Sequence, residues 1–143
     1  MEKILISACL VGDKVKYDGR SNYNEKVKLL LEKYELVPFC PEVEGGLPIP
    51  RTPSERVKDR VKMKDGKDVT RNYDIGAEKA LNICLYLGIK VAILKEYSPS
   101  CGTHQIYNGT FSNRKINGMG VTAELLKRKG ITVISEDEID TLL

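Results

Sequence analysis

Short apolar runs recur along this chain and are separated by polar or helical segments. The runs at 4–8, 91–94 and 131–134 are nearly continuous, as is typical of strands buried on both faces. Another strand is predicted at 36–39, where Pro38 cannot donate a ladder hydrogen bond and therefore places the strand at a sheet edge. The pattern thus predicts four strands.

Apolar residues at helical spacing lie between these strands. They predict helices at 27–34, at 77–87 and at 121–129, and the last two are followed by Gly88 and Gly130, which suit left-handed C-terminal caps. Alternating strands and helices are typical of a parallel sheet with right-handed crossovers. We therefore expect the α/β class, as a Rossmann-like, mostly parallel sheet with flanking helices.

Three segments fall outside this alternation. Residues 41–53 are rich in Pro and Gly and predict a loop, and the 60–70 segment around Asp65-Gly66 predicts a small β-hairpin insertion. Residues 98–120 form an irregular stretch that is unusually long unless it is functional. Because no linker or composition change interrupts the chain, we expect a single domain over 1–143.

The charge of the chain bears on whether it binds nucleic acid or a membrane. The 143 residues include 23 basic and 20 acidic ones, and a formal charge of +3 favours neither stable nucleic-acid binding nor a membrane surface. No apolar run approaches the roughly 20 residues that a transmembrane helix needs. The N-terminus leads directly into a strand and shows no signal peptide. We therefore expect a cytoplasmic protein.

The four cysteines are the candidate functional residues of this chain. In a reducing cytoplasm, cysteines are more often buried, catalytic or metal-bound than paired in disulfides. Cys84 lies on the apolar face of a predicted helix and is therefore expected to be a core residue. Cys9 and Cys40 each end a predicted strand, and Cys101 lies in the loop after a third. Since ligands bind at the carboxyl edge of such sheets, we expect these three thiols to meet there.

The spacing of the thiols leaves several sites open. Soft sulfur ligands suit zinc, copper(I) or an iron–sulfur cluster, and His104 lies close enough to Cys101 to be a fourth zinc ligand. A cluster held by only three cysteines would leave one iron open to a substrate. The alternatives are a zinc- or cluster-binding sensor, and a metal-free hydrolase that uses Cys101 with His104.

Several longer motifs follow one another in a fixed order, and they occupy residues 7–12, 17–19, 40–48, 50–51, 66–70, 94–102 and 106–111. Together they resemble, over nearly the whole chain, the thiouracil desulfidase (TudS) family. The resemblance implies a [4Fe–4S] cluster held by Cys9, Cys40 and Cys101, with Glu42 and Ser98 beside it. It also implies removal of sulfur from 4-thiouracil or its nucleotide.

A mechanism can be written for the residues in these motifs. The open iron would bind the substrate sulfur and polarise the C=S bond, so that water adds to the ring carbon. Glu42 is the expected general base for this water, and Ser98 is the expected hydrogen-bond donor.

Three further residues are expected to contact the substrate. Arg51 opens the segment 51–71, which carries eight basic and four acidic residues and could meet a nucleotide phosphate. Asp18 lies in one motif, and Ser100 flanks Pro99 in another. The spacing does not decide whether Ser98 or Ser100 faces the cluster.

Overall fold

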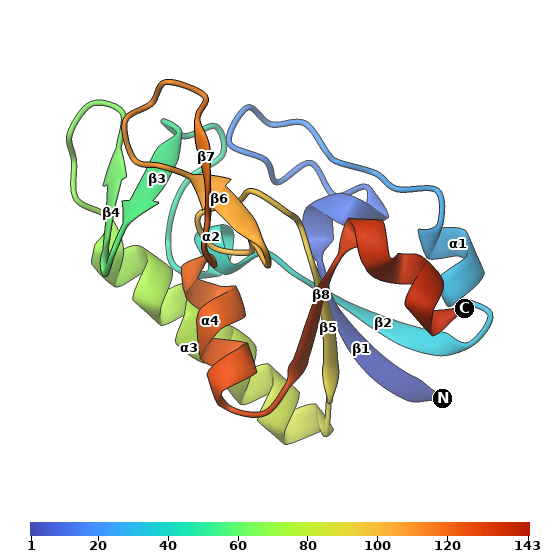
Figure 1. Ribbon diagram of the computed structural model, residues 1–143. Coiled ribbons are helices and arrows are strands. Elements are labelled where there is room, and N and C mark those ends of the chain that lie inside the picture. Colours follow the sequence, from blue (N-terminus) through green and yellow to red (C-terminus); the bar gives the residue numbers. More distant parts are fainter.

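The computed structural model describes residues 1–143 and centres on four parallel strands, in the order β2-β1-β5-β8 (Figure 1). They are β1 (Glu2–Ser7), β2 (Tyr34–Phe39), β5 (Val91–Leu94) and β8 (Thr132–Ser135). All three pairings are parallel. The expected α/β architecture is confirmed, and β2 lies at the sheet edge, as its proline predicts.

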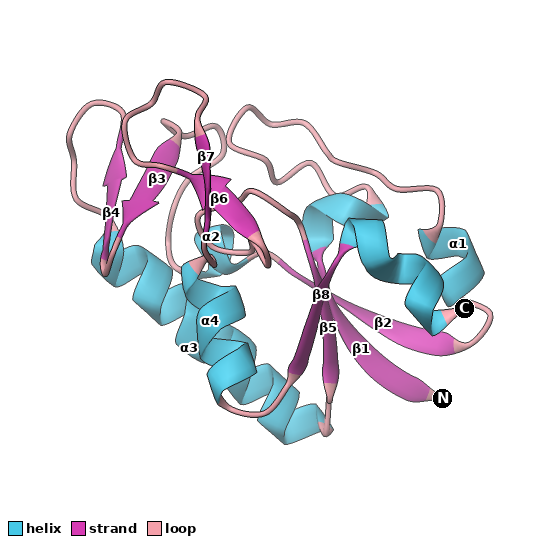
Figure 2. Cartoon of the chain, viewed as in Figure 1, coloured by secondary structure: helices cyan, strands magenta, loops and turns pink.

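Helices cover both faces of this sheet (Figure 2). On one face lie α3 (Thr70–Leu87) and α4 (Val121–Arg128), and on the other lie α1 (Val27–Leu30) and the 3₁₀ helices η1 (Ala8–Val11) and η2 (Glu136–Leu142). Alternate strand residues point to opposite faces and fill two cores. The first core includes Leu5, Phe39, Ala80, Leu94 and Leu126. The second includes Ile4, Ile6, Leu30, Ile93 and Ile139.

The predicted helix over 27–34 is wrong in length. Only one turn forms, and Tyr34 already begins β2, where its hydroxyl donates to the Leu142 carbonyl oxygen at 3.1 Å. Val27 and Leu30 are buried, whereas Leu31 is exposed. The apolar face is therefore too short for more than one turn, and the rest of the segment is recruited by the sheet edge.

The two other predicted helices are confirmed. α3 ends before Gly88, which has a left-handed φ of 70°, and α4 is followed two residues later by Gly130 with a φ of 90°. No helix is both long enough and apolar enough to cross a bilayer. One short helix, α2 (Pro41–Glu44), lies where a loop was predicted.

Two small hairpins stand beside the main sheet. One joins β3 (Ser54–Val57) to β4 (Arg60–Met63), and the other joins β6 (Gln105–Tyr107) to β7 (Lys115–Asn117). The second hairpin lies inside the long segment that was predicted to be irregular.

The hairpin predicted over residues 60–70 has different strands in the structure from those expected. Its second strand pairs with β3, which precedes it, and the turn of the hairpin is Lys58-Asp59. The Asp65-Gly66 turn also forms, but it makes only the single bridge between Lys62 and Asp68. That bridge leads the chain into α3.

Candidate active site

One pocket of about 460 Å³ opens at the carboxyl ends of β1, β2 and β5. Ligands of parallel α/β sheets bind at this edge, and the volume suits a small molecule. The residues that follow the three strands form part of the wall. The remainder comes from the loop that follows η1, the segment that leads into β3 and the start of β3, the turn after β4, and the end of β6 with the loop that follows it.

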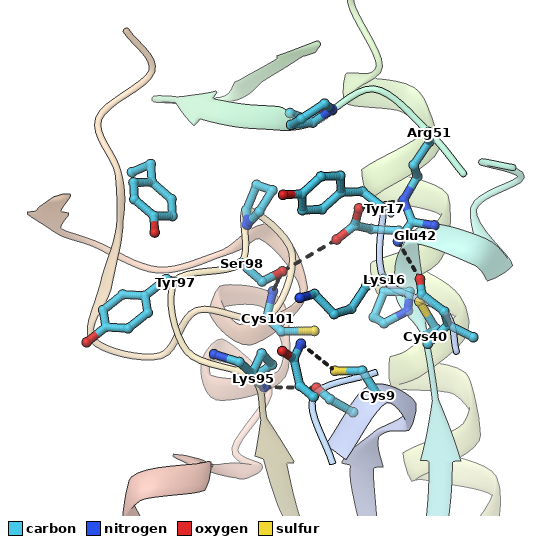
Figure 3. A pocket seen from close by; sticks show the side chains of 18 of the residues that line it. Cys9, Lys16, Tyr17, Cys40, Glu42, Arg51, Lys95, Tyr97, Ser98 and Cys101 are labelled. Atoms are coloured by element: carbon cyan, nitrogen blue, oxygen red, sulfur yellow. Dashed lines mark hydrogen bonds and ion pairs between the residues drawn. The ribbon is translucent and has the colours of Figure 1, made fainter. Parts of the chain in front are cut away.

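Three of the four cysteines line this pocket (Figure 3). Cys9 lies in the 3₁₀ turn after β1, Cys40 directly follows β2, and Cys101 lies in the turn after β5. Cys84 lies in the core between α3 and the sheet, as predicted. All four are free thiols. The structure thus brings the three expected thiols around one cavity from positions far apart in the sequence.

The surroundings of the three thiols affect their pKa values in two opposite directions. Burial raises the pKa of Cys9, Cys40 and Cys101, and the negative charges of neighbouring thiolates raise the pKa of Cys9 and Cys101 further. In the opposite direction, Asn22 Nδ2 donates to Cys9 Sγ at 3.4 Å, and the Val43 N–H favours the Cys40 thiolate. Hydrogen bonds to sulfur are typical of iron–sulfur ligands. This donor set fits such a cluster.

A single metal ion fits the site less well. No three His, Cys, Asp or Glu side chains converge closely enough to hold one ion. His104 lies outside the pocket, with its Nε2 2.6 Å from Glu138 Oε1. It is therefore neither a fourth ligand beside Cys101 nor the base of a Cys101–His104 pair. The structure removes the basis for a zinc site with His104 and for the metal-free hydrolase.

The Glu42 carboxylate lies on the pocket wall, in the first turn of α2. Its Oε1 accepts hydrogen bonds from Arg51 Nε at 3.1 Å and from the Tyr73 hydroxyl at 2.9 Å. Its Oε2 has only a long contact of 3.5 Å with Ser98 Oγ. One oxygen is therefore fixed by two donors, and the other is available to the pocket.

Close helix packing sets the position of Glu42. A Cβ atom on Gly45 would lie 2.0 Å from the Asn72 carbonyl oxygen, and one on Gly76 would lie 2.0 Å from the Pro41 carbonyl oxygen. Only glycine allows backbones to approach so closely. The two glycines therefore let α2 lie directly on α3, and they bring Tyr73 within reach of Glu42.

Arg51 supports the pocket wall rather than presenting a free charge. Its side chain is 4% exposed, and besides Glu42 it donates to the carbonyl oxygens of Pro48 at 3.2 Å and Val15 at 2.8 Å. All three guanidinium nitrogens are thus engaged. The expected contact between Arg51 and a substrate phosphate does not fit this geometry, and Arg51 is better described as a positioning residue for Glu42.

The two candidate serines lie in different surroundings. Ser98 lines the pocket, where its Oγ accepts from the backbone N–H groups of Ser100 at 3.1 Å and Cys101 at 3.0 Å. Its hydroxyl hydrogen remains free for Glu42. Ser100 is completely buried, lies 2.8 Å from Thr122 Oγ1, and does not line the pocket. The expected contact between Ser100 and a substrate therefore does not fit this geometry.

Asp18 also lies outside the pocket lining. Its carboxylate accepts from Arg20 N at 3.0 Å and Arg20 Nε at 2.9 Å, and so it shapes the surface turn. The expected contact between Asp18 and a substrate does not fit this arrangement, and the neighbours Lys16 and Tyr17 line the pocket instead.

Sequence reasoning missed a buried carboxylate that holds the Cys101 turn. Glu96 is 5% exposed and accepts hydrogen bonds from the Thr103 N–H, the Thr103 hydroxyl and the His104 N–H, at 2.9 to 3.0 Å. Burial acts to raise its pKa, but these hydrogen bonds outweigh burial and lower it. The only signal in the sequence was its place in the same motif as Ser98.

Tyr73 was missed as well, and its role can be tested. Its hydroxyl is buried, which raises its pKa and keeps it a donor to Glu42. We expect Tyr73→Phe to lower kcat about 3- to 10-fold, the value of one hydrogen bond, with no loss of bound iron. Steady-state kinetics and iron analysis check this result. Tyr86→Phe, on the exposed face of the same helix, is the matched control and should change neither quantity.

The fold and the site together define a class: an α/β protein with three thiols and a carboxylate around one pocket at the carboxyl edge of its sheet. The sequence model of the 2-thiouracil desulfurase family matches residues 4–138. The chain therefore belongs to the 2-thiouracil desulfurase family, a family of desulfidase enzymes.

Two similar proteins agree with this assignment. YbbK of Bacillus subtilis (strain 168), an uncharacterized protein, is 42% identical over 150 residues, which cover 98% of this chain and 99% of YbbK. A solved structure described as the [4Fe-4S]-dependent thiouracil desulfidase TudS is 49% identical, with a TM-score of 0.94. That match covers 99% of this chain and 95% of the TudS chain.

Proposed function

We propose that this protein catalyses [4Fe–4S]-dependent, non-redox desulfuration of a thiolated pyrimidine, namely 4-thiouracil or its nucleotide. The product is the oxo pyrimidine, and the sulfur leaves as sulfide. The observation that carries this proposal is the gathering of Cys9, Cys40 and Cys101 with Glu42 around one pocket, in a chain of the 2-thiouracil desulfurase family.

In this proposal Cys9, Cys40 and Cys101 hold the cluster, and one iron is left without a protein ligand. When bound, the cluster supplies a soft Lewis acid for the substrate sulfur. The raised pKa values of the three thiols mean that cluster binding releases protons, which burial makes costly to remove in the metal-free protein.

The side chains around the cluster would activate the attacking water molecule. The water oxygen forms a bond to the ring carbon while Glu42 Oε2 accepts one of its protons. Arg51 and Tyr73 keep Glu42 Oε1 fixed, so that Oε2 stays directed at the pocket. The C–S bond then breaks, and the net change is thiocarbonyl plus water to carbonyl plus hydrogen sulfide. No electrons are gained or lost.

Ser98 lies between the Cys101 turn and the Glu42 carboxylate, and it forms a hydrogen bond with each. It accepts from the Cys101 N–H and donates to Glu42 Oε2, so that it fixes the turn of a cluster ligand and contacts the base. During the reaction its hydroxyl would return a proton from Glu42 toward the departing sulfur. This assigns Ser98 a relay role, which agrees with its single transferable hydrogen.

Anaerobic reconstitution with iron and sulfide tests the proposal. The reconstituted protein should turn brown and release one sulfide for each 4-thiouracil converted to uracil. The family description names 2-thiouracil, so that isomer and the 4-thiolated nucleotide belong in the same assay. A brown protein that releases no sulfide from any of the three would support a cluster-binding sensor instead. A colourless protein that binds one zinc would contradict the cluster.

The four free cysteines also bear on where the protein works. Because unpaired thiols and an open cluster persist in reducing surroundings, this proposal places the enzyme in the cytoplasm.

A further inference from the structure

The pocket wall carries a lysine that lacks a close partner. Lys16 lines the pocket, and its Nζ reaches no acceptor within hydrogen-bond distance; Asp18 Oδ2 lies 4.0 Å away. Among the other cationic residues that line the pocket, Lys64 is exposed to solvent, whereas Lys95 and Arg51 are engaged. Lys95 Nζ lies 2.8 Å from Glu136 Oε2 and donates to a backbone carbonyl, and Arg51 is bound through all its nitrogens. Lys16 is thus the partly buried lysine of the pocket wall whose Nζ has no partner closer than 4.0 Å.

The backbone of Lys16 is held on both sides. Arg51 donates to the Val15 carbonyl oxygen through Nη2 and to the Tyr17 carbonyl oxygen through its backbone N–H, each at 2.8 Å. The Lys16 N–H itself donates to the Arg20 carbonyl oxygen at 3.1 Å. The arginine that orients Glu42 therefore also fixes the segment that carries Lys16.

The direction of the side chain agrees with this fixed backbone. Figure 3 shows Lys16 pointing into the pocket. Only 25% of its side chain is exposed, so its charge is partly shielded from water. A half-buried ammonium interacts with nearby charges more strongly than one in bulk solvent.

The charge balance of the proposed reaction calls for such a cation. With the cluster bound, three thiolates and Glu42 would place negative groups around the pocket, and the Arg51 charge is paired with Glu42. When Glu42 removes a proton from the attacking water, the adduct of water and pyrimidine gains a further negative charge. A fixed cation at that point lowers the barrier because it is already oriented.

We propose that Lys16 is a catalytic residue that contacts the pyrimidine and stabilises the negative charge of its water adduct. This inference rests on the proposed function and deepens it. In the alternative, Lys16 has only a structural role: its positive charge compensates the negative thiolates and so helps the protein to retain the cluster. The two views predict different behaviour of a neutral variant.

The test compares Lys16→Met with Lys16→Arg after anaerobic reconstitution. We expect Lys16→Met to keep wild-type iron and sulfide content and an unchanged visible spectrum, while kcat for the thiolated pyrimidine falls about 10- to 100-fold. KM should change much less than kcat. Lys16→Arg keeps the charge and should recover most of kcat. Lys14→Met, an exposed lysine of the same loop outside the pocket lining, should match the wild type.

Three outcomes would overturn the inference. They are an unchanged kcat in Lys16→Met, a rise in KM alone, and a loss of iron that Lys16→Arg restores. The last would show that the charge serves the cluster. A wild-type protein that assembles the cluster but releases no sulfide would instead refute the proposed function, so the two failures can be told apart.

Discussion

Replacement of Cys101 with alanine is expected to abolish assembly of the iron–sulfur cluster. Iron and acid-labile sulfide should fall from about four of each per chain to background, and the brown colour should be lost. A cluster with only two protein thiolates left would be open at two irons and would not persist. Cys9→Ala and Cys40→Ala should behave in the same way, because each supplies one wall of the same pocket. Metal analysis after anaerobic reconstitution measures the effect.

Cys84→Ala is the matched control for these variants. Cys84 is as deeply buried as Cys101, but it lies in the core between α3 and the sheet. Its loss should cost about 1 kcal/mol of folding stability or less and leave iron content unchanged. Loss of iron in Cys84→Ala with normal iron in Cys101→Ala would refute the ligand assignment.

Glu42→Gln should give the second large effect. The amide keeps the shape of the side chain but cannot accept a proton from water, so kcat should fall about 10²- to 10⁴-fold while the iron content stays normal. Sulfide release under saturating 4-thiouracil measures the change.

Glu44→Gln is the control on the same short helix. Glu44 is exposed, and its side chain has no partner in the pocket, so this variant should keep wild-type activity. A Glu42→Gln enzyme that turns over at the wild-type rate would remove Glu42 from the mechanism. A Glu42→Gln protein that fails to load iron would assign it to cluster assembly instead.

The strands and the meeting of the thiols were predictable from local patterns. Apolar runs mark buried parallel strands whatever their neighbours are, and the end of a parallel strand fixes the sheet edge. Cys9 and Cys40 follow two such strands, so their meeting needed only the topology. Cys101 lies several residues beyond β5, and its place at the pocket depends on a turn in which Glu96 accepts hydrogen bonds from the backbone N–H groups of Thr103 and His104.

The detailed roles could not be predicted, because they depend on contacts between distant segments. Ser98 and Ser100 flank the same proline, and only Thr122 of α4 decides that Ser100 is withdrawn into the core. Likewise, Arg51 resembles a free phosphate ligand until the loop carbonyls of Val15 and Pro48 are seen to engage it. Periodicity carries no information about such pairs.

Local patterns also failed where the sheet competed with helix propensity. The residues around Tyr34 have helical spacing, but Glu2 and Tyr34 begin a six-residue parallel pairing between β1 and β2. The hydrogen bonds of a whole paired strand stabilise the extended conformation more than two or three apolar positions at helical spacing stabilise a helix. The helix therefore stops after one turn, and the edge strand begins early.

Anaerobic diffraction from crystals of the reconstituted protein tests the central claim most directly. The claim predicts one cluster in the pocket at the edge of β1, β2 and β5, bonded to the sulfur atoms of Cys9, Cys40 and Cys101. Its fourth iron should lack a protein ligand and face the side of the pocket that carries Glu42. Iron bound elsewhere on the chain, or a single metal ion completed by another side chain, would contradict it.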